Sequence, residues 1–222
     1  MTDLDPPRHL VRDAVARALS EDLGPLGDLT GALVPSDTVA TGAITARADG
    51  TLAGEACVTE TWAQLDPHVE VQWAVRDGCP VTPGTVVARV AGPMRSVLAG
   101  ERTALNFLCH LSGVATLTRR FVTTAGGKIR IWDTRKTTPG LRALEKAAVR
   151  AGGGRNHRGN LSDMVLLKDN HLTGLSIDTA VRAARDQWPG RGVEVECERL
   201  DEVLAAVAAG ADLVMLDNLV PD

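Results

Sequence analysis

The fold is decided by the stretch MVLLKDNHLTGLSIDTAVRAARDQWPGRGVEVECERLDEVLAAVAAGADLVML, residues 164–216. Short apolar runs at 164–168, 193–197 and 213–216 alternate there with helical patterns at 178–188 and 200–209. A further strand is expected upstream at 129–132, and a further helix at 139–151. This alternation predicts a parallel sheet covered by helices. Because no G-x-G-x-x-G follows any of the strands, we favour an α/β barrel over a dinucleotide-binding sheet.

The first part of the chain has a different pattern. An amphipathic helix is expected at 8–20, ended by Gly24-Pro25, and residues 39–92 carry short β runs separated by glycine turns, with one short helix at 58–65. A long helical region follows at 94–124, with a break expected at Ser112-Gly113. We therefore predict three parts: an α+β domain at 1–93, a connecting helical region at 94–127, and a barrel part at 128–222.

Basic residues are concentrated in one segment. The net charge is −4, yet residues 128–158 hold nine lysines and arginines against only Asp133 and Glu145. Nucleic-acid-binding proteins usually combine such a patch with a basic chain and stacking aromatic residues, whereas this chain has four tryptophans, two phenylalanines and no tyrosine. We expect a small polyanionic ligand and no nucleic acid.

The composition also bears on location. No segment approaches 18 consecutive apolar residues, and the beginning MTDLDPPRHL is acidic, unlike a signal peptide. The four cysteines form no C-x-x-C pair, which argues against a zinc ribbon and a disulfide framework. We expect reduced, mostly buried thiols in a cytoplasmic protein that does not associate with membranes.

Polar side chains follow every expected strand of the second half. The carboxyl ends of parallel strands meet on one face, which is where ligands bind. We therefore expect four polar clusters to converge: Asp133–Lys136, Lys168–His171, Glu196 with Glu198, and Asp217 with Asn218.

The segment 133–140 places Arg135 and Lys136 ahead of a helix that is expected to have Thr138 as its N-cap and Pro139 as its first residue. The helix N-terminus adds unsatisfied N–H groups and a partial positive charge, so the segment predicts an anion cradle. A solvated basic loop is the alternative.

The segment GGGRNHR at 152–158 has more glycine than a helix end requires, which favours a close approach of the backbone to another group. His157 and Arg158 follow, and a guanidinium can bind a carboxylate with two hydrogen bonds. We favour a functional role for this segment.

Three further strand-end residues are candidates. Lys168 can contact an anion, form a Schiff base or cap the strand. Glu196 and Asp217 suit magnesium, sugar hydroxyls or a developing positive charge, and also suit structural caps. The histidines lack metal-ligand spacing, and neither G-x-S-x-G nor a complete phosphate loop occurs, so a protein-ligated zinc, a serine hydrolase and a nucleoside triphosphatase are excluded.

Seven motifs, in one order, resemble the quinolinate phosphoribosyltransferase family: ERTALN at 101–106, HLSGVAT at 110–116, DTRKTTPG at 133–140, GGGRNHR at 152–158, KDNH at 168–171, VE at 195–196 and LDN at 216–218. The resemblance implies an α/β protein, with an N-terminal α+β sandwich followed by an incomplete, open α/β barrel. It implies a homodimer or higher oligomer, in which the first domain of one subunit covers the barrel mouth of the other. The implied reaction transfers phosphoribose from phosphoribosyl diphosphate to quinolinate with decarboxylation. Its products are nicotinate mononucleotide, diphosphate and CO₂, it belongs to de novo NAD biosynthesis, and its cofactor is Mg²⁺.

The resemblance also implies roles for individual residues. Arg102 reaches across from the neighbouring subunit, the two carboxylates of quinolinate are surrounded by cations, and Lys136 adds charge toward the phosphates. The substrate-binding set is Arg102, Thr134, Arg135, His157 and Arg158. The catalytic set is Lys136, Lys168, Glu196 and Asp217, of which Lys168 also faces the quinolinate carboxylates and the two acids hold ribose hydroxyls or the Mg²⁺ carried by the diphosphate. Positioning and electrostatic stabilisation then carry the reaction, without a protein nucleophile.

The chain departs from the family at its end. It stops at Asp222, after the fourth expected barrel strand, where the family continues with further βα units whose glycine-rich loops hold the sugar 5-phosphate. The chain is therefore either a fragment of a longer protein or a shortened homologue. Two other functions stay open: a barrel lyase or aldolase with Lys168 as a Schiff-base amine, and a non-catalytic remnant that binds quinolinate or a partner subunit.

Overall fold

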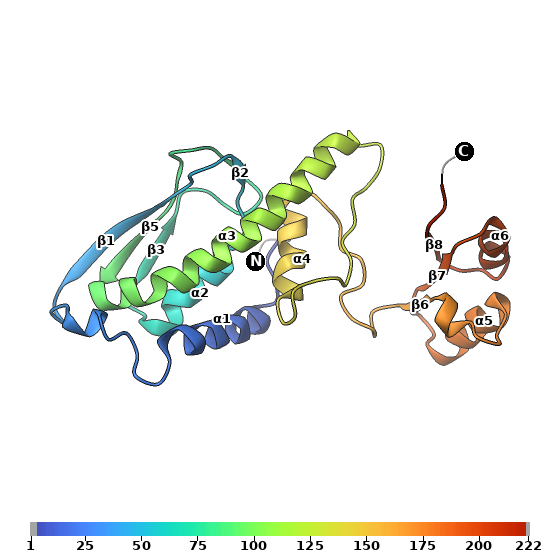
Figure 1. Ribbon diagram of the computed structural model, residues 1–222, viewed down its shortest axis with the longest axis horizontal. Coiled ribbons are helices and arrows are strands. Elements are labelled where there is room, and N and C mark those ends of the chain that lie inside the picture. Colours follow the sequence, from blue (N-terminus) through green and yellow to red (C-terminus); the bar gives the residue numbers. More distant parts are fainter. Residues whose placement is uncertain (1–3, 221–222) are drawn as a thin grey trace. The chain divides into compact units, whose positions relative to one another are not determined.

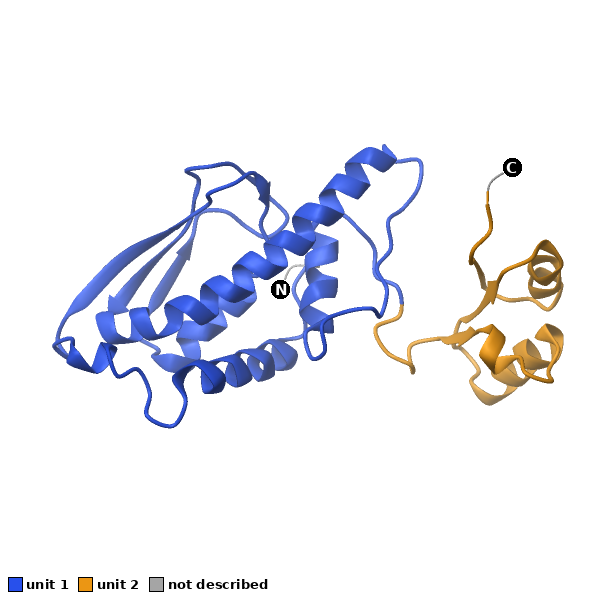
Figure 2. Cartoon of the chain, in the orientation of Figure 1, with its two compact units in different colours: residues 1–157 blue, residues 158–222 orange. Residues whose placement is uncertain are grey.

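A computed structural model describes residues 4–220 of the chain. The chain divides into two compact units, residues 1–157 (unit 1) and residues 158–222 (unit 2), which Figure 2 shows in different colours. Each unit has its own sheet and its own hydrophobic core. The architecture confirms the predicted α/β fold class, with a small sheet domain first and parallel strands last.

Unit 1 contains an antiparallel sheet in the order β1-β5-β3, beside the long helix α3 (Figure 1). In its register Val39 lies opposite Pro93, and Glu70 lies opposite Ala91. A separate two-stranded ribbon pairs β2 with β4. The strands are β1 (Val39–Thr45), β2 (Gly50–Thr51), β3 (Glu70–Trp73), β4 (Pro80–Val81) and β5 (Val86–Pro93).

Helices supply the rest of unit 1: α1 (Arg8–Leu23), η1 (Gly31–Leu33), α2 (Glu55–Leu65), α3 (Met94–Ala125) and α4 (Arg142–Ala151). One apolar cluster joins the sheet to α2 and α3 and includes Trp62, Val90 and Leu108. A second cluster joins α1, α3 and α4 and includes Val15 and Leu144. Burial of these apolar side chains is the main force that holds α4 and its flanking loops in place.

The break expected at Ser112-Gly113 is wrong, because α3 runs through both residues without interruption. The Ser112 hydroxyl links α3 to the segment before α2: it accepts a hydrogen bond from the Ala53 N–H at 3.0 Å and lies 3.2 Å from the Ala53 carbonyl oxygen. Leu111 and Ala115, on either side, are buried in the core. Packing of this helix therefore outweighs the modest helix propensity of serine and glycine.

Unit 2 is a three-stranded parallel sheet in the order β6-β7-β8 with two helices. Its core consists of Val193, Val195 and Cys197 from the central strand, packed against Val181 and Ala206 from the helices. The elements are β6 (Val165–Leu167), η2 (Asp169–His171), α5 (Ile177–Gln187), β7 (Val193–Cys197), α6 (Leu200–Ala208) and β8 (Leu213–Leu216). The βαβαβ pattern predicted from residues 164–216 is thus confirmed.

Two expectations about residues 129–141 are wrong. Instead of a strand at 129–132, there is one isolated parallel bridge between Trp132 and Arg155, and Ile129 and Trp132 remain largely exposed. Helix α4 begins at Arg142 and has Leu141 rather than Thr138 as its N-cap. The Thr138 N–H instead donates to the Glu145 carboxylate at 3.1 Å, so the preceding residues form a loop.

The thiols are divided evenly. Cys57 and Cys197 are buried, whereas Cys79 and Cys109 are exposed, so the expectation of mostly buried thiols is half right. Burial raises the pKa of Cys57 to about 12, with Asp77 and Glu60 adding to the effect. Among residues 4–220, no helix is both long enough and apolar enough to cross a membrane.

Candidate active site

The loop that follows Trp132 carries three predicted site residues, Thr134, Arg135 and Lys136. The Thr134 hydroxyl accepts a hydrogen bond from the Lys136 N–H at 3.0 Å, which curls the backbone around Arg135. Arg142, at the start of α4, donates through Nε to the Thr137 hydroxyl at 3.0 Å. The loop is therefore fastened by local hydrogen bonds, while the Lys136 side chain is exposed.

Asp133, at the start of this loop, forms a buried ion pair with Lys146 of α4. Their side chains are only 7% and 8% exposed. The Asp133 carboxylate also accepts hydrogen bonds from the His157 N–H at 2.8 Å and from Asn156 Nδ2 at 2.6 Å. The pair thus joins the loop, helix α4 and the segment that carries His157.

A second buried carboxylate lies next to Lys146 on α4. Glu145 accepts hydrogen bonds from the Thr138 N–H at 3.1 Å and pairs with His110 Nε2 of α3 at 2.8 Å. Burial raises its pKa, but the hydrogen bonds from Thr138 and His110 outweigh this effect and hold the pKa of Glu145 below its ordinary value. Glu145 is therefore an anion that holds the far end of the loop.

These groups surround a cavity of about 310 Å³. Its wall combines two lysines and two carboxylates with apolar side chains of α3 and α4: Val114, Asp133, Thr134, Lys136, Thr137, Thr138, Glu145, Lys146 and Val149. Since the carboxylates already accept hydrogen bonds from protein groups, the exposed ammonium of Lys136 and the Thr134 side chain are the parts of the wall suited to an anionic ligand.

Arg135 has an unsatisfied donor. Its Nε atom is enclosed and has no hydrogen-bond partner among the described residues. A buried donor without an acceptor costs about 1–3 kcal/mol, and such groups concentrate where a ligand or a movement supplies the acceptor. Arg135 therefore has a buried donor that a carboxylate of a ligand could satisfy.

The triple glycine serves packing within unit 1, in place of the predicted functional role. A Cβ at Gly152 would lie 2.6 Å from the Ala115 carbonyl oxygen and from Thr118 Cβ, both on α3. A Cβ at Gly154 would lie 2.7 Å from Val149 Cγ1, and Gly153 has φ of +89°. The glycines let the end of α4 pack closely against α3, so the close approach is to the protein's own helix.

Unit 2 brings two of the predicted catalytic residues together. Lys168, just after β6, donates to Glu196 of β7 at 2.6 Å, with side chains 39% and 14% exposed. Asp217, just after β8, is half-buried, and its N–H donates to the Cys197 carbonyl at 2.9 Å. Arg158 is half-buried, with a hydrogen bond to the Met164 carbonyl at 3.4 Å. The predicted catalytic residues at the ends of β6, β7 and β8 are therefore one ammonium and two carboxylates.

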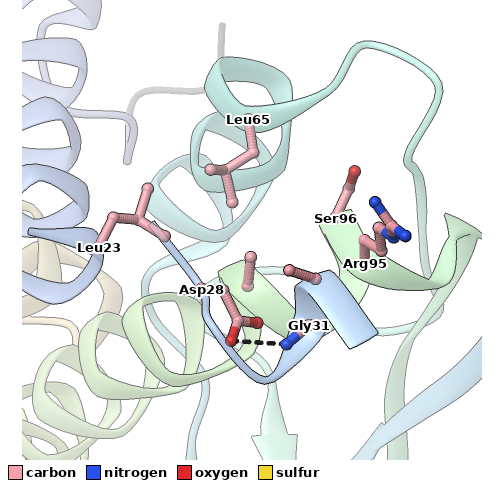
Figure 3. A pocket seen from close by; sticks show the side chains of 8 residues that line it. Leu23, Asp28, Gly31, Leu65, Arg95 and Ser96 are labelled. Atoms are coloured by element: carbon pink, nitrogen blue, oxygen red, sulfur yellow. Dashed lines mark hydrogen bonds between the residues drawn. The ribbon is translucent and has the colours of Figure 1, made fainter. Parts of the chain in front are cut away.

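Arg102 lies on α3 with its side chain exposed and lines neither cavity. The other cavity, of about 270 Å³, lies beside η1 (Figure 3). Its polar groups serve local structure, because Asp28 accepts a hydrogen bond from the Gly31 N–H at 2.8 Å and Arg95 donates to the Val34 carbonyl at 2.7 Å. None of the predicted site residues lines it.

No sequence pattern predicted roles for Lys146, His110 or Asn156. One signal was present: the buried face of α4, residues 144–148, contains the charged pair Glu145-Lys146 between apolar residues. Charged side chains are rarely buried without a partner, so this position required counter-ions elsewhere in the fold. Their identity depended on contacts with distant parts of the chain.

Comparisons with known proteins identify the family of the chain. Residues 28–112 match the family described as quinolinate phosphoribosyl transferase, N-terminal domain, and residues 114–222 match the corresponding C-terminal domain. The chain belongs to the quinolinate phosphoribosyl transferase family.

Relatives in this family have informative names. The probable nicotinate-nucleotide pyrophosphorylase (carboxylating) of Bacillus subtilis is 44% identical over 91% of this chain and 71% of its own length. The nicotinate-nucleotide pyrophosphorylase (carboxylating) of Mycobacterium leprae is 43% identical over 93% of this chain and 75% of its own length. The chain therefore spans about three quarters of these curated relatives.

A solved structure confirms the family fold. The nicotinate-nucleotide pyrophosphorylase from Francisella tularensis superposes with a TM-score of 0.92 at 39% sequence identity. The match covers 97% of this chain and 77% of that protein. The N-terminal sheet domain and the parallel-stranded C-terminal part thus both have counterparts in a quinolinate phosphoribosyl transferase.

Proposed function

We propose that this chain transfers phosphoribose from phosphoribosyl diphosphate to quinolinate and releases diphosphate and CO₂, giving nicotinate mononucleotide for NAD biosynthesis. The observation that carries the proposal is its membership of the quinolinate phosphoribosyl transferase family across both domains, residues 28–112 and 114–222. The names of the relatives, nicotinate-nucleotide pyrophosphorylase and quinolinate phosphoribosyltransferase, support the same reaction.

The substrate-binding role goes to residues of both units. Quinolinate is a dianion, so its recognition requires several cations and hydrogen-bond donors. The incomplete bonding of Arg135 and the exposure of Arg102 support their roles as carboxylate ligands, because both guanidinium groups have donors left for a ligand. The remaining residues of this set in the proposal are Thr134, His157 and Arg158.

The catalytic role goes to Lys136, Lys168, Glu196 and Asp217. As the bond between C1′ and the diphosphate breaks, positive charge develops on the ribose and negative charge on the leaving group. Lys136 and Lys168 stabilise the anionic groups, and the carboxylates of Glu196 and Asp217 hold the ribose hydroxyls and face the cationic ribose. The pyridine nitrogen then attacks C1′. The positively charged ring stabilises the electron pair left on its carbon when the adjacent carboxylate departs as CO₂, and a proton from solvent forms the new C–H bond.

The ion pair between Lys168 and Glu196 bears on the alternative of a Schiff-base lyase. Lys168 Nζ is bonded to a carboxylate oxygen at 2.6 Å, which gives the lysine an electrostatic role rather than that of an amine nucleophile. The pair therefore supports the transferase over the lyase.

Magnesium belongs to the proposal as a cofactor carried by the diphosphate. No cluster of three or more histidine, cysteine, aspartate or glutamate residues that could hold a metal occurs in residues 4–220. The donor set fits Mg²⁺ in another way, because this ion commonly binds one or two carboxylates together with substrate phosphates and water. Glu196 and Asp217 are the carboxylates that would hold it, and when bound it neutralises charge on the leaving diphosphate.

The proposal includes a homodimer, or a higher oligomer built from it, in which Arg102 of one subunit completes the site of its partner. It also includes a cytoplasmic location. The four unpaired thiols support this location, since exposed cysteines such as Cys79 and Cys109 persist in reducing compartments.

The test is a direct assay of the 222-residue chain with quinolinate, phosphoribosyl diphosphate and Mg²⁺. Nicotinate mononucleotide and CO₂ should form in equal amounts. Arg135→Ala is the matched negative control, because it should remove quinolinate binding while leaving the chain folded. Quinolinate binding without any diphosphate release would contradict the transferase and favour a protein that only binds.

A further inference from the structure

The ion pair between Asp133 and Lys146 holds both backbone polar groups of one residue. The His157 N–H donates to Asp133 Oδ1 at 2.8 Å, and the His157 carbonyl accepts from Lys146 Nζ at 2.9 Å. Asn156, the preceding residue, donates from Nδ2 to Asp133 Oδ2 at 2.6 Å and to the Lys146 carbonyl at 2.9 Å. The pair therefore grips the peptide groups on both sides of the His157 Cα.

Stability alone does not account for this pair. Two charges removed from water lose much of their hydration, and their attraction in the interior often only balances that loss. Well-packed apolar residues of similar size commonly give a folded protein equal or greater stability than a buried ion pair. A better account is that the pair sets geometry, because fixing the N–H and C=O of one residue holds its backbone torsions and hence the direction of its Cα–Cβ bond, from which the side chain extends.

We propose that Asp133 and Lys146 are positioning residues, which orient the His157 side chain and the loop of Thr134, Arg135 and Lys136 toward quinolinate. This inference rests on the proposed function, since it names what holds its substrate-binding residues in place. Asp133 directly precedes the loop and Lys146 lies on α4, so one buried pair links the loop to the segment that carries His157. Neither residue needs to touch the substrate.

The test begins with Asp133→Asn, which keeps the size of the side chain and an oxygen that can accept the His157 N–H. The amide cannot accept from Lys146, Asn156 and His157 together, because one of its two groups is a donor. We expect the variant to fold, the imidazole NMR signals of His157 to shift, and quinolinate affinity to fall by about 10- to 100-fold, the cost of a small misplacement of binding groups. A His157→Gln variant assigns the signals.

A matched control is Asp77→Asn, which alters a half-buried carboxylate of unit 1. Asp77 accepts hydrogen bonds from the backbone N–H groups of Gly54 at 3.1 Å and Glu55 at 3.2 Å. It has the same chemistry as Asp133 but lies at the start of α2, where no substrate-binding residue is proposed. This variant should leave the His157 signals and the quinolinate affinity unchanged.

Other outcomes decide against the proposal. Unchanged His157 signals and unchanged affinity in a folded Asp133→Asn variant would overturn it. If Asp133→Asn does not fold, Lys146→Gln gives the same two readouts, and failure of both variants to fold would make the pair a stability determinant only. Because the NMR readout needs no substrate, it tests the positioning role even if the unmodified chain does not bind quinolinate, a result that would contradict the proposed function instead.

Discussion

Each of the two units contains a lysine–carboxylate pair, and the two pairs are built differently. In unit 1, Lys146 and Asp133 are 8% and 7% exposed, and the pair also bonds to the backbone of His157. In unit 2, Lys168 and Glu196 are 39% and 14% exposed, and the one hydrogen bond found for Lys168 Nζ among the described residues is to Glu196. The Asp133–Lys146 pair therefore binds other groups of the protein, whereas Lys168 and Glu196 could release one another and bind a ligand.

The difference in exposure suggests a structural role for the first pair and a catalytic role for the second. An enclosed pair resists rearrangement, because any movement leaves a charge without a partner in a medium of low polarity. A partly exposed pair loses little when water or a substrate phosphate replaces one partner. The contrast predicts that the buried pair controls stability and geometry, and that the open pair controls turnover.

The largest expected effect on stability comes from Lys146→Met. The substitution leaves the Asp133 carboxylate buried without its counter-ion, and it should lower the free energy of unfolding by about 3–5 kcal/mol. Urea unfolding followed by circular dichroism measures this. The double variant Asp133→Asn/Lys146→Met should recover part of the loss, and a single variant as stable as the unmodified chain would break the comparison.

Arg135→Ala should act on binding rather than on stability. The enclosed Nε has no hydrogen-bond partner among the described residues, so the substitution should change the free energy of unfolding little. Quinolinate binding should weaken by about 2–5 kcal/mol, because a bidentate contact in a desolvated site is removed. Isothermal titration calorimetry with quinolinate gives the affinity. Undiminished affinity would remove Arg135 from the substrate-binding set.

Gly152→Ala tests whether the triple glycine serves packing. The added Cβ would lie 2.6 Å from the Ala115 carbonyl oxygen, so α4 must move away from α3 at a cost of about 1–3 kcal/mol. Thermal unfolding should show the loss. Gly152 has a φ of −70°, which alanine adopts without strain, so the matched control is Gly113→Ala, at a helical glycine of α3 with nothing within 4 Å. A loss no larger in Gly152→Ala than in the control would contradict the packing role of this glycine.

Lys168→Met should affect turnover strongly and stability little, the opposite of Lys146→Met. A pair that is open to solvent contributes about 1 kcal/mol or less to stability, so the unfolding curve should hardly move. In contrast, kcat/KM for formation of nicotinate mononucleotide should fall by about 100-fold or more, because the quinolinate carboxylates lose a cation that faces them. A strong loss of stability would erase the distinction between the two pairs.

The smallest effect is a pH dependence at Glu145. Its pKa is lower in the folded chain than the ordinary value of 4.5, so the ionised form stabilises the fold. This contribution is present above pH 4.5 and is lost as the pH falls through the lowered pKa. The stability difference between the unmodified chain and Glu145→Gln should therefore shrink between pH 5 and pH 3, in the order-of-magnitude window of an ordinary carboxyl. A constant difference would show that Glu145 does not bind His110 and Thr138 as an anion.

The sequence was most informative where structure is local. The alternation over residues 164–216 predicts all three strands of unit 2, because short apolar runs and amphipathic helices are patterns of neighbouring residues. It failed at residues 129–132, where a strand depends on a partner and only Trp132 bridges to Arg155. It also failed at Gly113, where the packed helix continues through a residue that is often a breaker. The predicted domain limits at 93 and 127 stay predictions.

By itself, the sequence determined the fold class, the order of the two parts and the set of candidate residues, since these depend on periodicity and on motifs that the chain carries in one order. Only the tertiary structure decided which charges are buried, that Lys146 meets Asp133, and that the glycines at 152–154 serve the packing of α4 on α3. Burial and pairing depend on residues distant in the chain, which no local pattern specifies.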